Sequence, residues 1–187
     1  MKIIQVRGNN GTGKTTVVRE FVKKHDYEII TIEVSGRKIE CHKIQDIIVI
    51  GRYDKNECGG CDASIKTGDE LKNVIAKISR TLNPKVIVFE GVMYGKTFSY
   101  SYEIFRFCKA IKAEYLGICL VPDFDTTLSR IYERNGGKEV NLEGLYGGWK
   151  SAIKSNKNLE KAKVPIALFD TSVMNKEEMG RILEQYI

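Results

Sequence analysis

The segment GNNGTGKT at residues 8–15 restricts the possible folds of this chain more than any other feature. The apolar run KIIQVR precedes it at residues 2–7, and a helical pattern follows at residues 14–24. The motif G-x-x-x-x-G-K-[ST], placed between a strand and a helix, forms a loop that binds the phosphates of a nucleoside triphosphate. This order therefore predicts a phosphate-binding loop at the start of an α/β sheet.

The chemistry of the loop follows from its residue types. Glycines let successive backbone N–H groups turn toward a phosphate, and the positive end of the helix dipole points at the same place. Lys14 adds positive charge for the β- and γ-phosphates, the Thr15 hydroxyl is a ligand for Mg²⁺, and Thr16 can bind an α-phosphate oxygen. We therefore expect ATP and Mg²⁺ as cofactors, with the nucleotide bound by Gly8, Asn9, Asn10, Gly11, Thr12, Gly13, Lys14, Thr15 and Thr16.

Strand and helix patterns alternate along the rest of the chain, which predicts a three-layer αβα fold of the P-loop NTPase type. The alternating residues around Ser35-Gly36 predict a small hairpin at the sheet edge, over residues 28–34 and 37–44. A mostly parallel five-stranded sheet is expected from residues 2–7, 46–51, 85–89, 115–121 and 164–169. Helices are expected over residues 14–24, 101–113, 125–134 and 148–162, and after the capping residues Thr67 and Asn175.

Length and composition exclude several classes of protein. With 187 residues, the chain is expected to form one kinase domain over residues 1–187. Its 42% hydrophobic and 29% charged residues are typical of a globular chain rather than a disordered one. No apolar run approaches the roughly 18–20 residues that span a bilayer, and no signal peptide is recognisable, so we expect no membrane partner and a cytoplasmic location.

The five cysteines do not form a recognisable disulfide or metal framework. Their number is odd, and a reducing compartment disfavours disulfides. Cys58 and Cys61 form one C-x-x-C, but no second pair follows to complete the four ligands of a structural zinc. Cys108 and Cys119 lie in apolar periodic segments, which predicts core positions for both.

Polar residues that follow predicted strands are the candidates for chemistry, because ligands bind at the carboxyl ends of parallel strands. Glu90 follows the run KVIVF and is expected to hold Mg²⁺; the alternative is a helix cap or a surface acid. In the segment GRYDKNECGGCD, Asp54 is the first candidate for the carboxylate that orients or deprotonates an acceptor hydroxyl, with Asp62 and Glu90 as alternatives. The same segment is expected to bind the acceptor through Arg52, Tyr53, Gly59, Gly60 and Asp62.

Arg130 and Arg134 are four residues apart, on one face of a predicted helix that leads to Asn135-Gly136-Gly137. Small kinases use such arginines in a mobile lid to stabilise the transferring phosphoryl group. We therefore expect a lid at about residues 130–148, in which both arginines are catalytic together with Lys14. The alternative is a solvated helix face.

An ordered set of segments is similar to a known family. The segments are IIQVRGNNGTGKTT, IGRYDKNECGGCD, IVFEGVMYG and SRIYERNGG, and the CGGCD element is the most discriminating. Together they resemble the bacteriophage-encoded 5-hydroxymethyluracil DNA kinases. The resemblance implies phosphorylation of the hydroxymethyl group of a modified base already within DNA, a step in thymidine hypermodification, in the host cytoplasm.

The expected function is ATP-dependent transfer of the γ-phosphate to that hydroxymethyl group, with DNA carrying a modified thymine analogue as the partner. Lysines and aromatic residues near the predicted site are compatible with DNA, above all in the lysine-rich helix 148–162. Two alternatives remain open. One is a soluble nucleoside or nucleoside-monophosphate kinase, and the other is a P-loop NTPase that serves as a binding module.

Overall fold

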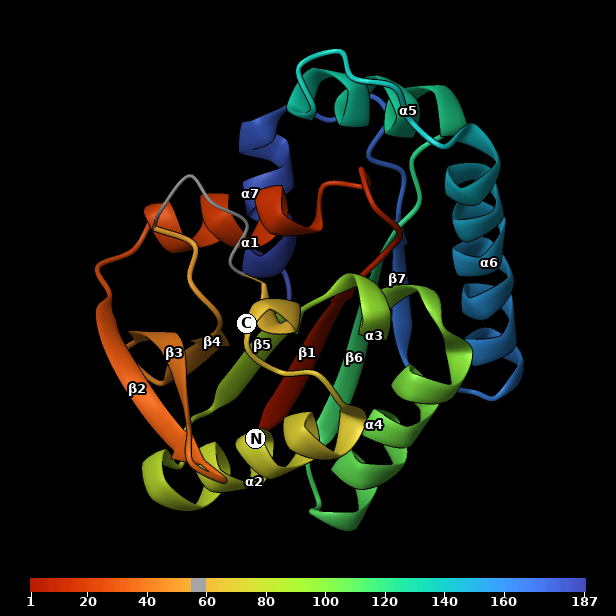
Figure 1. The fold of residues 1–187 in the computed structure, drawn as a ribbon. Coiled ribbons are helices and arrows are strands. Elements are labelled where there is room, and N and C mark those ends of the chain that lie inside the picture. The colour runs from red at the N-terminus through yellow and green to blue at the C-terminus, as the bar shows by residue number, and fades with distance from the viewer. Residues whose placement is uncertain (55–59) are drawn as a thin grey trace.

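A mixed sheet between two layers of helices organises the chain (Figure 1). The structure is a computed structural model that describes residues 1–54 and 60–187. In these residues the sheet has seven strands in the order β2-β3-β4-β5-β1-β6-β7, which confirms the predicted α/β fold. The strands are β1 (Lys2–Arg7), β2 (Glu28–Val34), β3 (Arg37–Ile44), β4 (Ile47–Ile50), β5 (Val86–Glu90), β6 (Glu114–Leu120) and β7 (Ile166–Phe169).

The β2–β3 hairpin is part of this sheet. Strands β4, β5, β1, β6 and β7 run parallel, and β3 pairs with β4 in the antiparallel direction. The pairing runs from Cys41 opposite Ile50 to Ile44 opposite Ile47. The predicted number of five strands is therefore wrong, because the hairpin expected at the sheet edge adds two hydrogen-bonded strands to the sheet.

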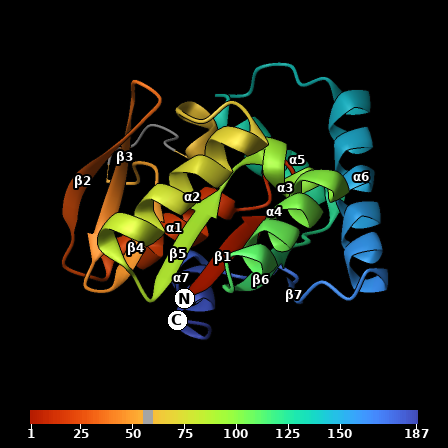
Figure 2. The same ribbon diagram turned by 90° about the horizontal axis from the view of Figure 1, so that it is seen from below.

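Helices cover both faces of the sheet (Figure 2). Helices α1 and α7 pack together on one face, whereas α2, α4 and α6 contribute to the core on the other face. The helices are α1 (Lys14–Lys23), the 3-10 helix η1 (Cys61–Ala63), α2 (Gly68–Leu82), α3 (Val92–Lys96), α4 (Phe98–Ala110), α5 (Phe124–Arg134), α6 (Leu142–Lys161) and α7 (Lys176–Glu184).

Alternating side chains of β1 enter both halves of the core. Ile4 packs in one cluster with Phe21 of α1 and Leu183 of α7. Ile3 packs in the other cluster with Leu71 of α2. Burial on both faces fixes β1 in the middle of the sheet and thereby fixes the start of the glycine-rich loop that follows it.

Two helix boundaries differ from the prediction. Helix α6 begins at Leu142 rather than near residue 148, because the Asn141 side chain caps it by accepting a hydrogen bond from the Gly144 N–H at 2.9 Å. The predicted helix at 101–113 begins at Phe98 and follows the separate short helix α3. The glycines in EGLYGGW therefore belong to α6 and not to a loop.

The described cysteines, Cys41, Cys61, Cys108 and Cys119, are buried free thiols. This confirms the predicted core positions of Cys108 and Cys119. Cys58, the other member of the C-x-x-C, lies outside the described residues. Within the described ranges, every helix is too short or too polar to cross a membrane.

A buried histidine lies where the hairpin meets the parallel strands. His42 on β3 is fully buried, and its Nε2 accepts a hydrogen bond from the Tyr53 N–H at 2.9 Å. Burial lowers the pKa of His42, although Asp54, with Oδ1 at 3.7 Å from Nε2, acts in the opposite direction. Of the other charges nearby, Arg52 lowers this pKa and Glu40 raises it. The imidazole is therefore neutral in the folded protein at neutral pH.

We expect the free energy of unfolding, measured by urea denaturation, to fall as the pH drops from about 7 to about 5. Below the usual histidine pKa of about 6.5, the unfolded chain gains a proton at His42 that the folded chain does not bind. The variant His42→Gln should show a flatter pH dependence. Equal slopes for His42→Gln and the wild type would contradict this assignment.

Candidate active site

The predicted phosphate loop connects the end of β1 to α1 (Figure 1). Gly8, Gly11 and Gly13 have φ angles of 149°, 76° and 93°, which residues with a Cβ rarely adopt. Gly13 is the N-cap of α1 and brings no side chain to the helix terminus. The first N–H groups of α1 are therefore available to a phosphate.

Lys14, Thr15 and Glu90 form a charged centre beside the loop. Lys14 Nζ donates a hydrogen bond to the Asn9 carbonyl oxygen at 2.8 Å, and the Thr15 hydroxyl donates to Glu90 Oε1 at 3.0 Å. Burial raises the pKa of the Glu90 carboxyl, while the charge of Lys14 and the bond from Thr15 act in the opposite direction. Adjacent hydroxyl and carboxylate oxygens are ligands that suit Mg²⁺.

Helix α6 and the segment after β7 hold the loop in place. Asn9 Nδ2 donates to the Leu145 carbonyl oxygen at 3.3 Å, and the Thr171 hydroxyl donates to the Thr12 carbonyl oxygen at 3.1 Å. A Cβ at position 148 would lie 2.8 Å from Asn9 Nδ2. Gly148 therefore allows α6 to approach the loop closely.

Arg130 reaches the loop through Thr171. Its Nη1 and Nη2 donate to the Thr171 hydroxyl oxygen at 3.2 Å and the Thr171 carbonyl oxygen at 2.6 Å. A Cβ on Gly13 would lie 3.8 Å from Arg130 Nη1. The guanidinium therefore stands beside the N-terminus of α1, where the loop is expected to bind phosphate.

Arg134 is placed differently, at the exposed end of α5. It makes no hydrogen bond or ion pair with the described residues. The connection from α5 to α6, residues 135–141, is largely exposed and has positive φ at Gly136 and Gly137. The predicted lid at 130–148 thus contains the ends of two helices and one exposed connection, and its closure stays a prediction.

The structure pairs Asp54 with Arg52. Arg52 Nε and Nη2 donate to the two carboxylate oxygens of Asp54 at 2.6 and 2.5 Å, and Arg52 Nη1 donates to Glu40 at 2.7 Å. The hydrogen bonds from Arg52 lower the pKa of the Asp54 carboxyl to about 2. A carboxylate with so low a pKa is a weak proton acceptor.

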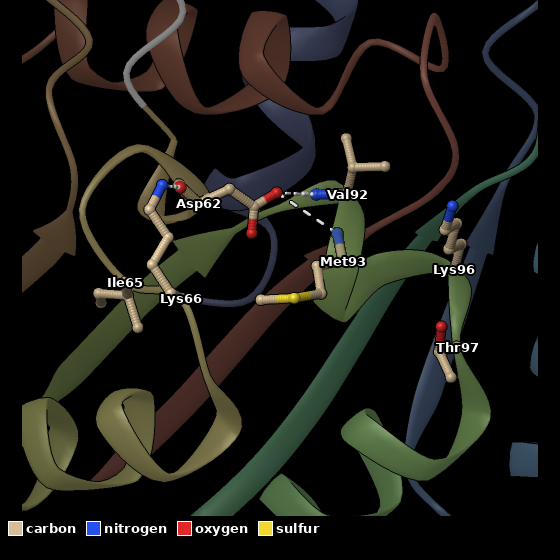
Figure 3. Close-up of a pocket in the computed structure, with 7 residues that line it drawn as sticks. All are labelled: Asp62, Ile65, Lys66, Val92, Met93, Lys96 and Thr97. Atoms are coloured by element: carbon tan, nitrogen blue, oxygen red, sulfur yellow. Dashed lines mark hydrogen bonds between the residues drawn. The ribbon is translucent and has the colours of Figure 1, made fainter.

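Asp62, in η1, lies beside Glu90. One of its oxygens, Oδ2, accepts hydrogen bonds from the Val92 N–H at 2.5 Å and the Met93 N–H at 3.3 Å (Figure 3). The other, Oδ1, is buried and has no hydrogen-bond partner in the described part of the chain. A Cβ on Gly91, the residue after Glu90, would lie 2.3 Å from Asp62 Oδ1, and the negative charge of Asp62 contributes to the raised pKa of Glu90.

Two further residues of the predicted acceptor segment contact Glu90. Tyr53 is fully buried, its hydroxyl donates to the Ile50 carbonyl oxygen at 3.4 Å, and it also acts to lower the pKa of Glu90. A Cβ on Gly60 would lie 2.4 Å from Glu90 Oε1, so a larger residue would displace that carboxyl. Gly59 lies outside the described residues. Two residues of the segment after β4 therefore lie beside Glu90, the expected ligand of Mg²⁺.

A pocket of about 400 Å³ opens beside Asp62 (Figure 3). Its volume is within the range of small-molecule sites. Lys66 Nζ is bound by the carbonyl oxygens of Asp62 and Ala63 at 2.6 and 3.1 Å, whereas Lys96 makes no hydrogen bond or ion pair with the described residues. The lining residues are Asp62, Ile65, Lys66, Val92, Met93, Lys96 and Thr97.

The structure brings Lys14, Thr15, Glu90 and Asp62 together. Asp54 instead pairs with Arg52, which also binds Glu40 on strand β3 of the hairpin. The catalytic and binding roles of these residues stay predictions. Thr171 is not among the predicted site residues. It belongs to the polar sequence DTS after the last strand, and its place at a strand end was the signal that could have revealed it.

Comparison with known proteins identifies the family. Residues 1–185 match the family described as 5-hmdU DNA kinase. The chain belongs to this family. It is 33% identical over 145 residues to the 5-hmdU DNA kinase of Pseudomonas phage M6, with 75% of each chain covered. It is also 33% identical over 110 residues to the 5-hmdU DNA kinase of Delftia phage PhiW-14, over 54% of this chain and 41% of that relative.

Membership of the 5-hmdU DNA kinase family confirms the predicted resemblance and makes the chain a phosphotransferase. Among solved structures, the tunicamycin resistance protein of Deinococcus radiodurans is similar, with a TM-score of 0.54 and 12% identity. The similarity covers 98% of this chain and 94% of that protein, and it supports the fold alone.

We expect Lys14→Ala to reduce phosphoryl transfer from γ-labelled ATP at least about 100-fold, the usual effect of losing one charge-stabilising group. The fold should persist, because Lys14 Nζ contacts a loop carbonyl and not the apolar core. Lys23→Ala is the matched control: this lysine lies on the same helix and forms an exposed ion pair with Glu20. Wild-type activity in Lys14→Ala would exclude the loop as the nucleotide site.

Proposed function

We propose that this chain transfers the γ-phosphate of Mg²⁺-bound ATP to the hydroxymethyl group of 5-hydroxymethyluracil in DNA. The observation that carries the proposal is the position of the pocket at Asp62. Asp62 lies next to Glu90, and the Thr15 hydroxyl joins Glu90 to the phosphate loop. The related kinases come from phages, so the reaction would take place on DNA in the host cytoplasm.

In the nucleotide half of the site, residues 8–16 bind the triphosphate through backbone N–H groups at the start of α1. Lys14 adds its charge to the β- and γ-phosphates. Thr15 and Glu90 would hold Mg²⁺, and the ion would supply positive charge to the phosphate oxygens. Arg130, which is bound to Thr171 beside the start of α1, would stabilise the negative charge of the transferring phosphoryl group. Arg134 would join it if the lid closes.

In the acceptor half, the modified base occupies the pocket. The apolar side chains of Ile65, Val92 and Met93 suit the faces of a pyrimidine ring, and Asp62 receives its hydroxymethyl group. A base within a duplex must first leave the stack, or the substrate must be single-stranded. Exposed lysines on α6 supply positive surface for the DNA backbone: Lys150, Lys154, Lys157 and Lys161.

We assign the acceptor carboxylate to Asp62 and not to Asp54. Two backbone N–H groups fix Asp62 Oδ2, while Oδ1 is buried without a partner among the described residues; the acceptor would uncover this oxygen on binding and donate its hydroxyl hydrogen bond to it. The hydroxyl oxygen attacks the γ-phosphorus, the bond to the β–γ bridging oxygen breaks, and ADP leaves. The hydroxyl proton passes to Asp62 late in the step, because a primary alcohol is too weak an acid to ionise beforehand.

The first test follows the radiolabel from γ-labelled ATP in the presence of DNA that contains 5-hydroxymethyluracil. We expect label in this DNA and none in unmodified DNA of the same sequence. The free nucleoside 5-hydroxymethyldeoxyuridine should be a poor acceptor. Label only in the nucleoside would indicate a soluble nucleoside kinase, and label only in free phosphate would indicate an NTPase without an acceptor.

The second test compares two carboxylates. Asp62→Asn should lower the turnover number by about 10²–10⁴-fold, the usual contribution of a general base, because Asn can accept the backbone hydrogen bonds but cannot take the proton. The affinity for ATP should change little. Asp54→Asn should retain most of the activity, as should the exposed control Asp69→Asn. Loss of turnover in Asp54→Asn with retention in Asp62→Asn would reverse the assignment.

A further inference from the structure

Arg7, the last residue of β1, is fully buried and stands directly before the phosphate loop. Arginine is almost never fully buried unless it is paired. Arg7 Nη2 donates to the Gly95 carbonyl oxygen at 3.2 Å and to the Ser155 hydroxyl oxygen at 2.9 Å. Its Nε and Nη1 have no hydrogen-bond partner among the described residues, and no carboxylate in the same ranges forms an ion pair with it.

No carboxylate forms an ion pair with this guanidinium in the described ranges, although the charge of Glu160 on α6 acts on its neighbour Cys119. Tyr115 and Cys119 lie on the neighbouring strand β6, and burial raises the pKa of both groups, which keeps them neutral. The positive charge of Arg7 acts against both of these rises, and a side-chain hydrogen bond with Arg7 also lowers the pKa of Cys119. These neighbours therefore solvate the charge in part and do not neutralise it.

Helices α3 and α6 enclose Arg7 next to the loop. Helix α3 contacts the end of β1 and also contacts α6 (Figure 1). A Cβ on Gly95 would lie 2.9 Å from the backbone N and O of Gly8 and 3.4 Å from the Arg7 Cα. Charges enclosed in a protein interior are screened less than charges in water, so they act over longer distances.

We propose that Arg7 is a positioning residue for the nucleotide: its buried charge strengthens triphosphate binding from behind the loop, and the phosphates are its counter-charge. The inference rests on the proposed nucleotide site at residues 8–16. Arg7 acts on the phosphates through its electric field, while its bonds to Gly95 and Ser155 keep α3 and α6 against β1. A buried charge without a partner destabilises a folded chain, and the bound triphosphate relieves this penalty.

Two substitutions at position 7 separate the role of the charge from a purely structural role. Both Arg7→Met and Arg7→Lys remove the guanidinium and its hydrogen-bond geometry, but only Arg7→Lys retains a positive charge. If the charge matters, Arg7→Met is the more stable of the two without ligand and the weaker in phosphate binding. If the role were purely structural, the less stable of the two variants would also be the weaker binder of phosphate.

The experiment measures ligand-free Tm by thermal unfolding, and Kd for ATP and for inorganic tripolyphosphate by calorimetry. We expect Arg7→Met to weaken both ligands roughly tenfold and Arg7→Lys less than about threefold, the size of one charge effect at moderate distance in a protein. Arg7→Met should nevertheless have the higher Tm of the pair. Ser155→Ala removes one hydrogen bond and no charge, so it should bind both ligands like the wild type.

Equal affinities for Arg7→Met and Arg7→Lys would overturn the proposal. So would a Tm of Arg7→Met below that of Arg7→Lys, or failure of Arg7→Met to fold while Arg7→Lys folds. A loss of ligand affinity in Ser155→Ala as large as that in Arg7→Met would overturn it too, because the contact with α6 would then explain the effect. If the wild type bound neither ligand, the proposed nucleotide site would itself be wrong, together with this inference.

Discussion

The parallel register between β5 and β1 is the constraint on which the candidate site depends. It places Glu90 opposite Val6, so the last residue of β5 lies beside the start of the phosphate loop. The Thr15 hydroxyl can then reach Glu90 from the first turn of α1. The chain that follows Glu90 enters α3, whose first N–H groups orient Asp62. One strand pairing thus links both halves of the site, at the sheet edge where open α/β proteins bind ligands.

The site concentrates features that lower local stability. The loop contains three glycines with positive φ, and Lys14, Glu90 and Arg7 are buried close to it. The surrounding scaffold compensates, because β1 is buried on both faces and α1 packs against α7 through apolar side chains. Such a rigid apolar frame around a glycine-rich loop and buried charges is expected where a protein must hold an anionic ligand in one position.

Features set by neighbouring residues could be predicted from the sequence, whereas features set by distant contacts could not. The strand, the loop and the first helix follow from one local motif. The start of α6 and the pairing of β3 with β4 depend on partners elsewhere in the chain. Asp54 and Asp62 both follow β4, and spacing alone does not decide which of them faces Glu90. The backbone N–H groups of Val92 and Met93, which lie 30 and 31 residues after Asp62, fix Asp62 there by hydrogen bonds.

The contact between α6 and the loop has a consequence for how this protein can be observed. Trp149 is the only tryptophan in the sequence and is the neighbour of Gly148, which lies against Asn9 of the loop. Its indole N–H donates to the Pro122 carbonyl oxygen at 2.9 Å, and its ring stacks on Tyr146 with centroids 5.9 Å apart. Tryptophan emission therefore arises from a single indole held next to the phosphate loop. The chain carries an intrinsic optical reporter of events at that loop, with no added label.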